Sequence, residues 1–195
     1  MKVGLIAGSG DLPGSVVAAT LQAEHEIFIA FLDGFSAPQD CQLEHGIFGL
    51  AEFGKMVSSF HKAGCTHVCF AGNVQRPDFR KLKPDLKGLR HLPGAVKAAA
   101  QGDDSLLAYL LAIFEAEGFG IVSPQALCSH LLIPTGNLGR AVLTESHKKD
   151  AEKACITASA IGALDIGQAA IVCRGLILAV EAQEGTDEML KRTAR

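Results

Sequence analysis

Met1-Lys-Val-Gly-Leu-Ile-Ala-Gly-Ser-Gly-Asp-Leu-Pro-Gly14 decides the fold of this chain. Its apolar run 2–7 predicts a buried strand, its glycine-rich loop predicts a tight turn, and helical spacing follows to about Ala23. Further strands are predicted at 26–32, 45–50, 67–71 and 119–122, with helices at 51–63 and 105–117. Strands that alternate with helices of this length predict right-handed βαβ units and a mostly parallel sheet. We therefore expect an α/β fold whose N-terminal domain, residues 1–130, is Rossmann-like.

A second region begins in the turn-rich stretch Ile133-Pro-Thr-Gly-Asn137. Residues 146–164 have helical texture, and two apolar runs around Arg174-Gly175 predict a hairpin. A short helix from Asp187 ends the chain. Because one hairpin with so few helices is too little for an independent core, we expect residues 131–195 to be the start of a second, smaller α/β domain that looks incomplete.

Composition limits the classes of function. With 195 residues, of which 48% are hydrophobic, the chain is long enough to bury a substantial core. The formal charge of −3 gives no overall attraction to nucleic acid, so no nucleic-acid partner is expected. The sequence shows neither a signal peptide nor a run of about 18 apolar residues. These features predict a cytoplasmic protein and leave its oligomeric state open.

Six cysteines occur without any Cys-x-x-Cys pair. In a chain without a secretion signal, they are expected to be reduced thiols that behave as small core residues. The closest grouping is His61, Cys65, His67 and Cys69. Its spacing matches no standard zinc module, so buried thiols beside ordinary histidines are favoured over a structural metal.

The loop Gly8-Ser9-Gly10-Asp11 follows the first predicted strand and leads into a helix. Backbone N–H groups in such a loop, supported by the helix dipole, form a site for a phosphate or another anion. We therefore predict that Gly8, Ser9, Gly10 and Asp11 bind substrate, with a tight turn and helix cap as the alternative. Pro13 stands where a dinucleotide fingerprint needs its third glycine, which disfavours a nicotinamide dehydrogenase.

A second loop, Gly72-Asn73-Val-Gln-Arg76, begins where the predicted strand 67–71 ends. Open α/β sheets bind ligands at this edge. Asn73 can both donate to and accept from a sugar or a uracil edge, and Arg76 can hold a phosphate through two hydrogen bonds. Gly72, Asn73 and Arg76 are therefore predicted to bind substrate, the alternative being that they satisfy the loop backbone.

Residues 76–97 carry seven cations against two acids, with leucines at helix-like intervals. Pro84 and Pro93 are expected to limit any helix here to short pieces. The mixture suits an anionic headgroup with acyl chains better than a nucleic acid, because aromatic side chains for stacking are nearly absent. We expect peripheral contact with the inner-membrane surface through this stretch, and a solvated charged face is the alternative.

Acidic and amide side chains gather at the ends of the later elements. They are Asp103, Asp104, Gln168, Glu181, Glu184 and Asp187, with Gly185 and Thr186 at a predicted helix start. Grouped carboxylates suit Mg²⁺, which takes one or two of them plus waters and substrate phosphates, although the sequence does not assign the metal ligands. As alternatives, Asp103 or Asp104 could cap the helix that follows, and Thr186-Asp187 could cap its helix or form a phosphate cradle. The sequence has no Gly-x-Ser-x-Gly elbow, Walker loop or His-x-x-x-His pair, which disfavours serine hydrolases, P-loop enzymes and zincins.

Six motifs taken together resemble those of one known family. They are Gly4-Leu-Ile-Ala-Gly-Ser-Gly-Asp-Leu-Pro13, Ala71-Gly-Asn-Val-Gln-Arg-Pro77, Lys83-Pro-Asp-Leu-Lys-Gly-Leu89, Gly102-Asp-Asp-Ser-Leu-Leu107, Gly162-Ala-Leu-Asp-Ile-Gly-Gln168 and Ala179-Val-Glu-Ala-Gln-Glu-Gly-Thr-Asp187. The family is the UDP-2,3-diacylglucosamine pyrophosphatases of the LpxI type, found in α-proteobacteria and other Gram-negative bacteria that lack the calcineurin-like enzyme. The resemblance spans the whole chain in the right order.

The resemblance implies a two-domain α/β protein that holds a lipid-linked sugar nucleotide between its domains. It implies Mg²⁺-dependent attack of water on the pyrophosphate of UDP-2,3-diacylglucosamine, which releases UMP and 2,3-diacylglucosamine 1-phosphate for lipid A synthesis. The family pattern continues beyond the position of Arg195 with a Pro-Gly-x-Asp segment, where the catalytic carboxylate is expected. Of the acids present, Asp187 and Asp104 are the predicted catalytic contacts. Two alternatives are a non-catalytic remnant that binds the lipid-linked sugar or nucleotide, and an unrelated Rossmann-like nucleotide-binding module.

Overall fold

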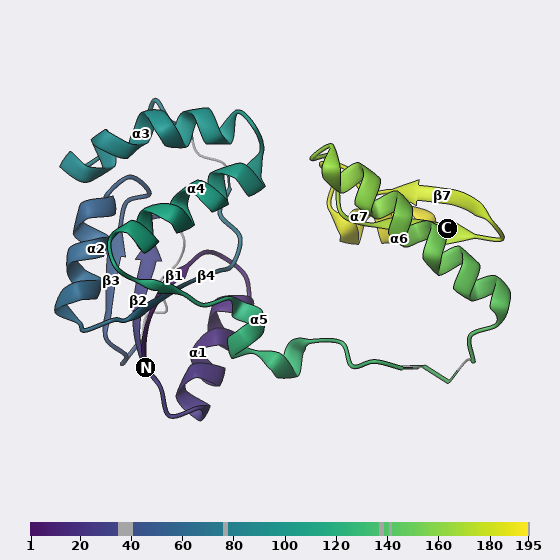
Figure 1. Ribbon diagram of the computed structural model, residues 1–195, viewed down its shortest axis with the longest axis horizontal. Coiled ribbons are helices and arrows are strands. Elements are labelled where there is room, and N and C mark those ends of the chain that lie inside the picture. The colour runs from purple at the N-terminus through teal and green to yellow at the C-terminus, as the bar shows by residue number, and fades with distance from the viewer. Residues whose placement is uncertain (35–40, 76–77, 137–138, 141, 195) are drawn as a thin grey trace. The chain divides into compact units, whose positions relative to one another are not determined.

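The computed structural model describes residues 1–34, 41–75, 78–136, 139–140 and 142–194. They divide into two compact units, Met1–Ile133 (unit 1) and Pro134–Arg195 (unit 2), and each is described here by itself. In chain order, unit 1 contains β1 (Lys2–Ala7), α1 (Leu12–Gln22), β2 (Glu26–Leu32), β3 (His45–Phe48), α2 (Phe53–Lys62), β4 (His67–Ala71), α3 (Leu86–Ala99), α4 (Asp103–Ala116), β5 (Gly120–Ile121), α5 (Pro124–Leu127) and the 3₁₀ helix η1 (Ser129–Leu131) (Figure 1).

The strands of unit 1 form one parallel sheet in the order β3-β2-β1-β4-β5. From β1 the chain proceeds outward to β2 and β3, then returns to place β4 on the other side of β1. The carboxyl ends of β1 and β4 therefore meet at the point where the strand order reverses, which is where open α/β sheets bind ligands. The predicted α/β class with a parallel sheet is confirmed.

Both faces of the sheet are covered by helices, as a parallel sheet requires. One face packs under α2 and α4, with Phe60 and Phe114 fully buried between the helices and the strands. Gly4 leaves room for this packing, because a Cβ atom there would lie only 3.0 Å from the Phe60 ring. The other face packs under α1 and α5, around Leu5 and Val16. Alternation along each strand thus divides the core into two layers.

The segment after β4 forms a longer helix than its prolines predict. α3 runs unbroken from Leu86 to Ala99 with Pro93 inside it, so the prediction of short helical pieces was wrong. Asp85 stabilises the helix start, because its carboxylate accepts the Gly88 N–H at 2.7 Å and the Lys55 N–H of α2 at 2.8 Å. Burial opposes ionisation of Asp85, but these backbone donors outweigh it and hold the pKa of Asp85 below its ordinary value.

α4 also begins differently from the prediction. Gly102 occupies its N-cap at a φ of 133°, and α4 starts at Asp103 without any side-chain cap. Asp103 and Asp104 therefore lie in the first turn, where negative charge complements the helix dipole. The prediction that either aspartate caps this helix was wrong, and both carboxylates are left for other contacts.

Unit 2 contains α6 (Glu145–Ala163), β6 (Ala170–Cys173), β7 (Leu176–Val180) and α7 (Thr186–Thr193). β6 and β7 form the predicted antiparallel hairpin. Arg174 and Gly175 have φ of 50° and 76°, the left-handed pair that a tight two-residue hairpin needs. The Asp150 carboxylate of α6 accepts both of their N–H groups, at 2.8 and 2.7 Å, and so ties the helix to the turn. None of the helices in the described parts of the chain combines the length and apolar character that crossing a bilayer requires.

Candidate functional site

The two predicted ligand loops of unit 1 are joined to each other through their backbones. The Ser9 N–H donates to the Asn73 carbonyl at 2.8 Å, and the Asn73 N–H donates to the Ser9 carbonyl at 2.9 Å. The Ser9 hydroxyl adds a third bond to the same Asn73 carbonyl, and the Gly8 N–H donates to Ala71. The loops after β1 and β4 thus form one rigid rim at the point where the strand order reverses.

Two glycines make this close approach possible. A Cβ atom at Gly8 would lie 2.6 Å from the Asn73 carbonyl oxygen, and one at Gly72 would lie 2.7 Å from the Ser9 carbonyl oxygen. Gly72 also has a φ of 93°, which side-chain-bearing residues rarely adopt. These glycines are therefore required by backbone packing within the rim.

The rim changes which groups of the first loop can bind an anion. The N–H groups of Gly8 and Ser9 are occupied by Ala71 and Asn73. The N–H groups of Gly10 and Asp11 donate to no acceptor within the described ranges, and they precede the first turn of α1. The Asp11 side chain makes no cap bond to α1. An anion at this loop would therefore be held by Gly10 and Asp11 rather than by all four residues.

A cavity of about 460 Å³ opens beside the rim. Its wall includes Gly72 and Asn73 from the β4 loop and Asp103 and Asp104 from the first turn of α4. The rest of the lining is apolar and comes mainly from the strands, α1, α2 and α4. It includes Ile6, Leu12, Leu32, Phe53, Met56, Phe70 and Phe114. Gly8, Ser9, Gly10 and Asp11 do not line it. The structure therefore brings four of the predicted binding residues together around an apolar floor.

Arg76 lies outside the described residues, so its predicted phosphate contact stays a prediction. The neighbouring Val74 lines the cavity.

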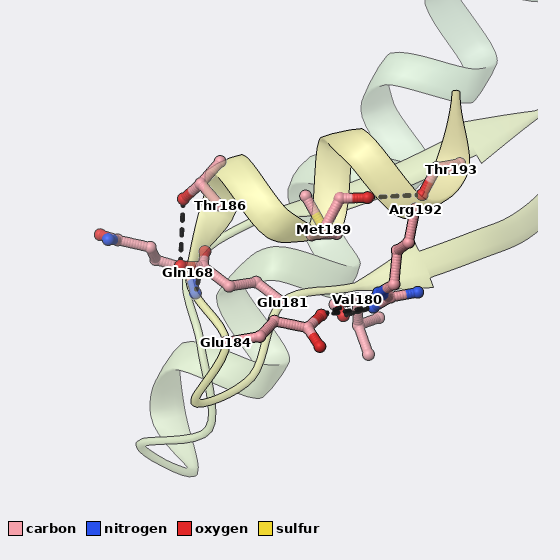
Figure 2. Close-up of polar contacts among 8 residues, drawn as sticks. All are labelled: Gln168, Val180, Glu181, Glu184, Thr186, Met189, Arg192 and Thr193. Atoms are coloured by element: carbon pink, nitrogen blue, oxygen red, sulfur yellow. Dashed lines mark hydrogen bonds and ion pairs between the residues drawn. The ribbon is translucent and has the colours of Figure 1, made fainter. Parts of the chain in front are cut away.

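In unit 2, a buried carboxylate joins the predicted binding segments around the end of β7. Glu181 is 6% exposed and directly follows the strand. One of its oxygens accepts the Gln168 N–H at 3.2 Å, and the other accepts the Thr186 hydroxyl at 3.0 Å (Figure 2). Gly167 packs against the same residue, since a Cβ atom there would lie 2.3 Å from the Glu181 carbonyl oxygen. Glu181 thus organises the loops that contain Gln168 and Thr186.

Other predicted residues of unit 2 have distinct surroundings. Glu184 forms an ion pair with Arg192, whose guanidinium lies 2.7 Å from the carboxylate and also donates to the Val180 carbonyl at 2.8 Å. Gly185 is the N-cap of α7 at a φ of 86°, and the Thr186 hydroxyl is used by Glu181. The alternative that Thr186 and Asp187 cap the helix is therefore not what the structure has. Asp187 is exposed in the first turn of α7.

The comparisons with known proteins cover both units. The family described as LpxI N-terminal domain matches residues 2–131, and the family described as LpxI C-terminal domain matches residues 134–195. The chain belongs to the LpxI family. It is 45% identical over 193 residues to the UDP-2,3-diacylglucosamine pyrophosphatase LpxI of Caulobacter vibrioides, and the alignment spans 99% of this chain and 69% of that relative.

The cysteine grouping predicted to be core thiols is largely buried in unit 1. Cys65 and Cys69 are 7% and 0% exposed. Burial raises the pKa of the Cys65 thiol to about 11 and that of the Cys69 thiol to about 12. The His61 ring stacks on Phe119, with ring centroids 4.4 Å apart. Burial thus disfavours the thiolate form of both side chains, as is typical of structural core cysteines.

No cluster of three or more His, Cys, Asp or Glu side chains that could hold a metal ion occurs in the parts of the chain that the structure describes. Asp103 and Asp104 provide two carboxylates at the cavity. Mg²⁺ commonly binds one or two protein carboxylates when substrate phosphates and waters complete its coordination shell. The donor types fit such a shared site in unit 1.

Sequence reasoning missed two residues that shape these sites and the structural role of a third. Asp85 caps α3 and Arg192 forms an ion pair with Glu184, and neither role was predicted. Glu181 was predicted as one of the grouped carboxylates, but not as the residue that organises two loops of unit 2. Glu181 had a usable signal, because an acid placed directly after an apolar strand is set at the boundary of the core. Asp85 also had one, since Asp before Leu-Lys-Gly matches a helix N-cap. Arg192 had none, because its partners lie eight and twelve residues earlier in the chain.

Proposed function

We propose that this chain hydrolyses the pyrophosphate of UDP-2,3-diacylglucosamine to UMP and 2,3-diacylglucosamine 1-phosphate, a step of lipid A biosynthesis. The observation that carries the proposal is membership of the LpxI family across both units, including a curated pyrophosphatase relative. Family membership removes the alternative of an unrelated Rossmann-like nucleotide-binding module.

The cavity of unit 1 supports a substrate with polar and apolar parts. Asn73 can donate to and accept from a sugar or uracil edge, while the apolar floor suits an acyl chain or the face of a ring. The N–H groups of Gly10 and Asp11 offer a nearby contact for a phosphate. We propose Gln168, Glu184, Gly185 and Thr186 of unit 2 as further substrate contacts. Glu181 holds the Gln168 backbone N–H and the Thr186 hydroxyl in place.

The carboxylates at the cavity favour a divalent cation in the reaction. Asp103 and Asp104 beside a pyrophosphate would repel it, since like charges in a partly apolar site interact strongly. Mg²⁺ shared between these carboxylates and the substrate would neutralise that charge and make the bridging oxygen a better leaving group. Asp103 and Asp104 are the residues that we propose hold it.

The reaction needs a base as well as charge neutralisation. A water oxygen forms a bond to one phosphorus, and the bond from that phosphorus to the bridging oxygen breaks with its electron pair on the departing phosphate. The water proton passes to a carboxylate that acts as the base. We propose Asp104 and Asp187 as the carboxylates that contact the reacting groups. Each is a first-turn residue of a helix, so its backbone is fixed while its side chain is left for the substrate.

The test is UMP release from UDP-2,3-diacylglucosamine by the purified chain, with and without Mg²⁺, alongside substrate binding by calorimetry. Mg²⁺-dependent release supports the proposed hydrolysis. A folded chain that binds the substrate without releasing UMP would contradict it and favour the non-catalytic binding alternative. We further propose a cytoplasmic protein that meets its diacylated substrate at the inner face of the membrane.

A further inference from the structure

α3 has an apolar stripe on the face that it turns to solvent. Leu86 is 90% exposed, Leu89 is 59% exposed and Val96 is 44% exposed, and Pro93 lies between them, also exposed. Their spacing of three and four residues places them along one side of the helix. In Figure 1, α3 lies at the outer boundary of unit 1. Apolar side chains grouped in this way on an exposed surface commonly mark a site of interaction with a protein or a membrane.

A line of cations runs beside the apolar stripe. Arg90 and Lys97 are seven residues apart, hence two turns apart on the same side of α3, and both are exposed. Neither has a carboxylate partner in the described part of the chain, and Lys83, just before the helix, has none either. Lys87, by contrast, is paired with Glu117 at 2.6 Å. Three cations are therefore available for an external anionic surface.

The opposite side of α3 is firmly held by the rest of unit 1. A Cβ atom at Gly88 would lie 1.9 Å from the Ala51 carbonyl oxygen, and one at Gly94 would lie 2.1 Å from the Tyr109 hydroxyl. The helix is thus packed as closely as glycine allows at both points. Leu86 and Leu89 are therefore exposed although α3 is packed against the rest of unit 1.

Beneath α3 is a second cavity, of about 130 Å³, lined by Leu92 and Ala95 of α3 and by Leu106 and Leu110 of α4. Leu106 and Leu110 also line the larger cavity. α3 therefore presents leucines to solvent on one side and encloses apolar space next to the proposed site on the other.

We propose that the outward face of α3, with Leu86, Leu89 and Val96 as its apolar part and Lys83, Arg90 and Lys97 as its cationic part, docks on an anionic phospholipid bilayer. An interfacial helix buries an apolar stripe at the headgroup level while flanking cations contact anionic headgroups. This deepens the proposed function, since a diacylated substrate resides in a bilayer, but the geometry of α3 stands without it.

The test is co-sedimentation of the whole chain with vesicles of phosphatidylcholine alone or with about a third phosphatidylglycerol, without substrate. Wild type should bind the anionic vesicles more tightly than the neutral ones. Leu86→Gln/Leu89→Gln should weaken that binding at least about tenfold through lost apolar burial. Arg90→Glu/Lys97→Glu should do the same through charge, with the loss disappearing at high salt. Glutamine and glutamate preserve the helix.

Matched controls change the same residue types elsewhere. Leu21→Gln/Ile156→Gln replaces a leucine and an isoleucine that are 45% and 65% exposed. Lys62→Glu/Lys149→Glu reverses the charge of two exposed lysines outside α3. Both should bind vesicles as wild type does. Equal loss in the controls would overturn the proposal, as would a wild type that ignores vesicles. So would α3 variants that dissociate a dimer in light scattering while vesicle binding persists.

UMP release measured in detergent micelles separates this proposal from the enzymatic one. The α3 variants should release UMP at the wild-type rate there, because detergent presents the substrate without a bilayer. Vesicle binding by a chain without turnover would leave the docking surface standing and contradict the proposed function. Turnover in micelles by a chain that does not bind vesicles would support the proposed function and contradict the docking surface.

Discussion

Ser9 and Asn73 exchange backbone hydrogen bonds of 2.8 and 2.9 Å, which join the loops after β1 and β4 into one rim. The two residues are 64 positions apart in the chain. Their pairing places Asn73 at the wall of the cavity and determines which N–H groups of the first loop are left for an anion. The geometry of the candidate site in unit 1 therefore depends on a contact that no local motif contains.

Gly72→Ala should disrupt this rim. The new Cβ atom would lie 2.7 Å from the Ser9 carbonyl oxygen, and the backbone has a φ of 93° that alanine disfavours. We expect the free energy of unfolding to fall by about 1–3 kcal/mol, measured by urea unfolding with circular dichroism. Gly14→Ala is the control, because a Cβ atom there meets nothing within 4 Å and α1 favours alanine. A Gly72→Ala chain as stable as wild type would show that the rim is not required.

Asp104→Asn should impair the reaction without unfolding the protein. Asp104 lines the cavity from the first turn of α4, and its side chain caps nothing. Removing a carboxylate that contacts the reacting groups should lower UMP release by about 100-fold or more. Glu115→Gln, on the exposed side of the same helix, should leave the rate unchanged. A loss shared by both variants would point to α4 as a whole.

Asp187→Asn tests the proposed contact in unit 2. Asp187 is exposed, so its loss should leave thermal stability nearly unchanged. We expect UMP release to fall by about 100-fold, while Glu188→Gln, the next residue of α7, should retain wild-type activity. Stopped assays of UMP at saturating substrate would measure both. Full activity in Asp187→Asn would remove this residue from the proposed chemistry.

Thr186→Val should lower the free energy of unfolding of unit 2, whereas Thr186→Ser should leave it nearly unchanged. The Thr186 hydroxyl donates to the buried Glu181 carboxylate at 3.0 Å, and valine keeps the shape while removing the donor. Hydrogen bonds to charged groups contribute about 1.5–3 kcal/mol, so the valine variant should lose stability on this scale. Amide hydrogen exchange at Gln168, which donates to the same carboxylate, should accelerate in the valine variant alone.

The sequence predicted most strands and helices of both units because their patterns are local. Residues 3–7 are apolar throughout and are followed by a glycine-rich loop, which predicted β1. In unit 2, Arg174-Gly175 between apolar runs predicted a hairpin that the structure has. α3 was mispredicted because Pro93 was weighed alone. The Asp85 cap and the contact of Gly88 with Ala51, which outweigh one missing hydrogen bond, depend on segments brought together by folding.

The candidate site was predictable in its residue types but not in their partners. The expectation that ligand groups gather after β1 and β4 follows from the topology of a parallel sheet. The topology does not determine whether a given N–H or carboxylate is free to bind a ligand. The Gly8 N–H donates to the Ala71 carbonyl, and the Glu184 carboxylate forms an ion pair with Arg192. Such competition is decided by tertiary packing and is invisible in a single sequence.

The buried thiols predict a loss of stability in alkali. Burial raises the pKa of Cys65 to about 11 and of Cys69 to about 12, above the ordinary value of 9.0 that the unfolded chain should have. From about pH 9 to pH 11, the unfolded state therefore binds fewer protons than the folded state, and stability must fall as pH rises. The slope is at most about 1.4 kcal/mol per pH unit for each thiol. Urea unfolding between pH 8 and pH 10.5 should show it, and Cys69→Ala should reduce the slope while Cys155→Ala, an exposed thiol, should not. An equal slope in all three chains would assign the alkaline loss to other groups.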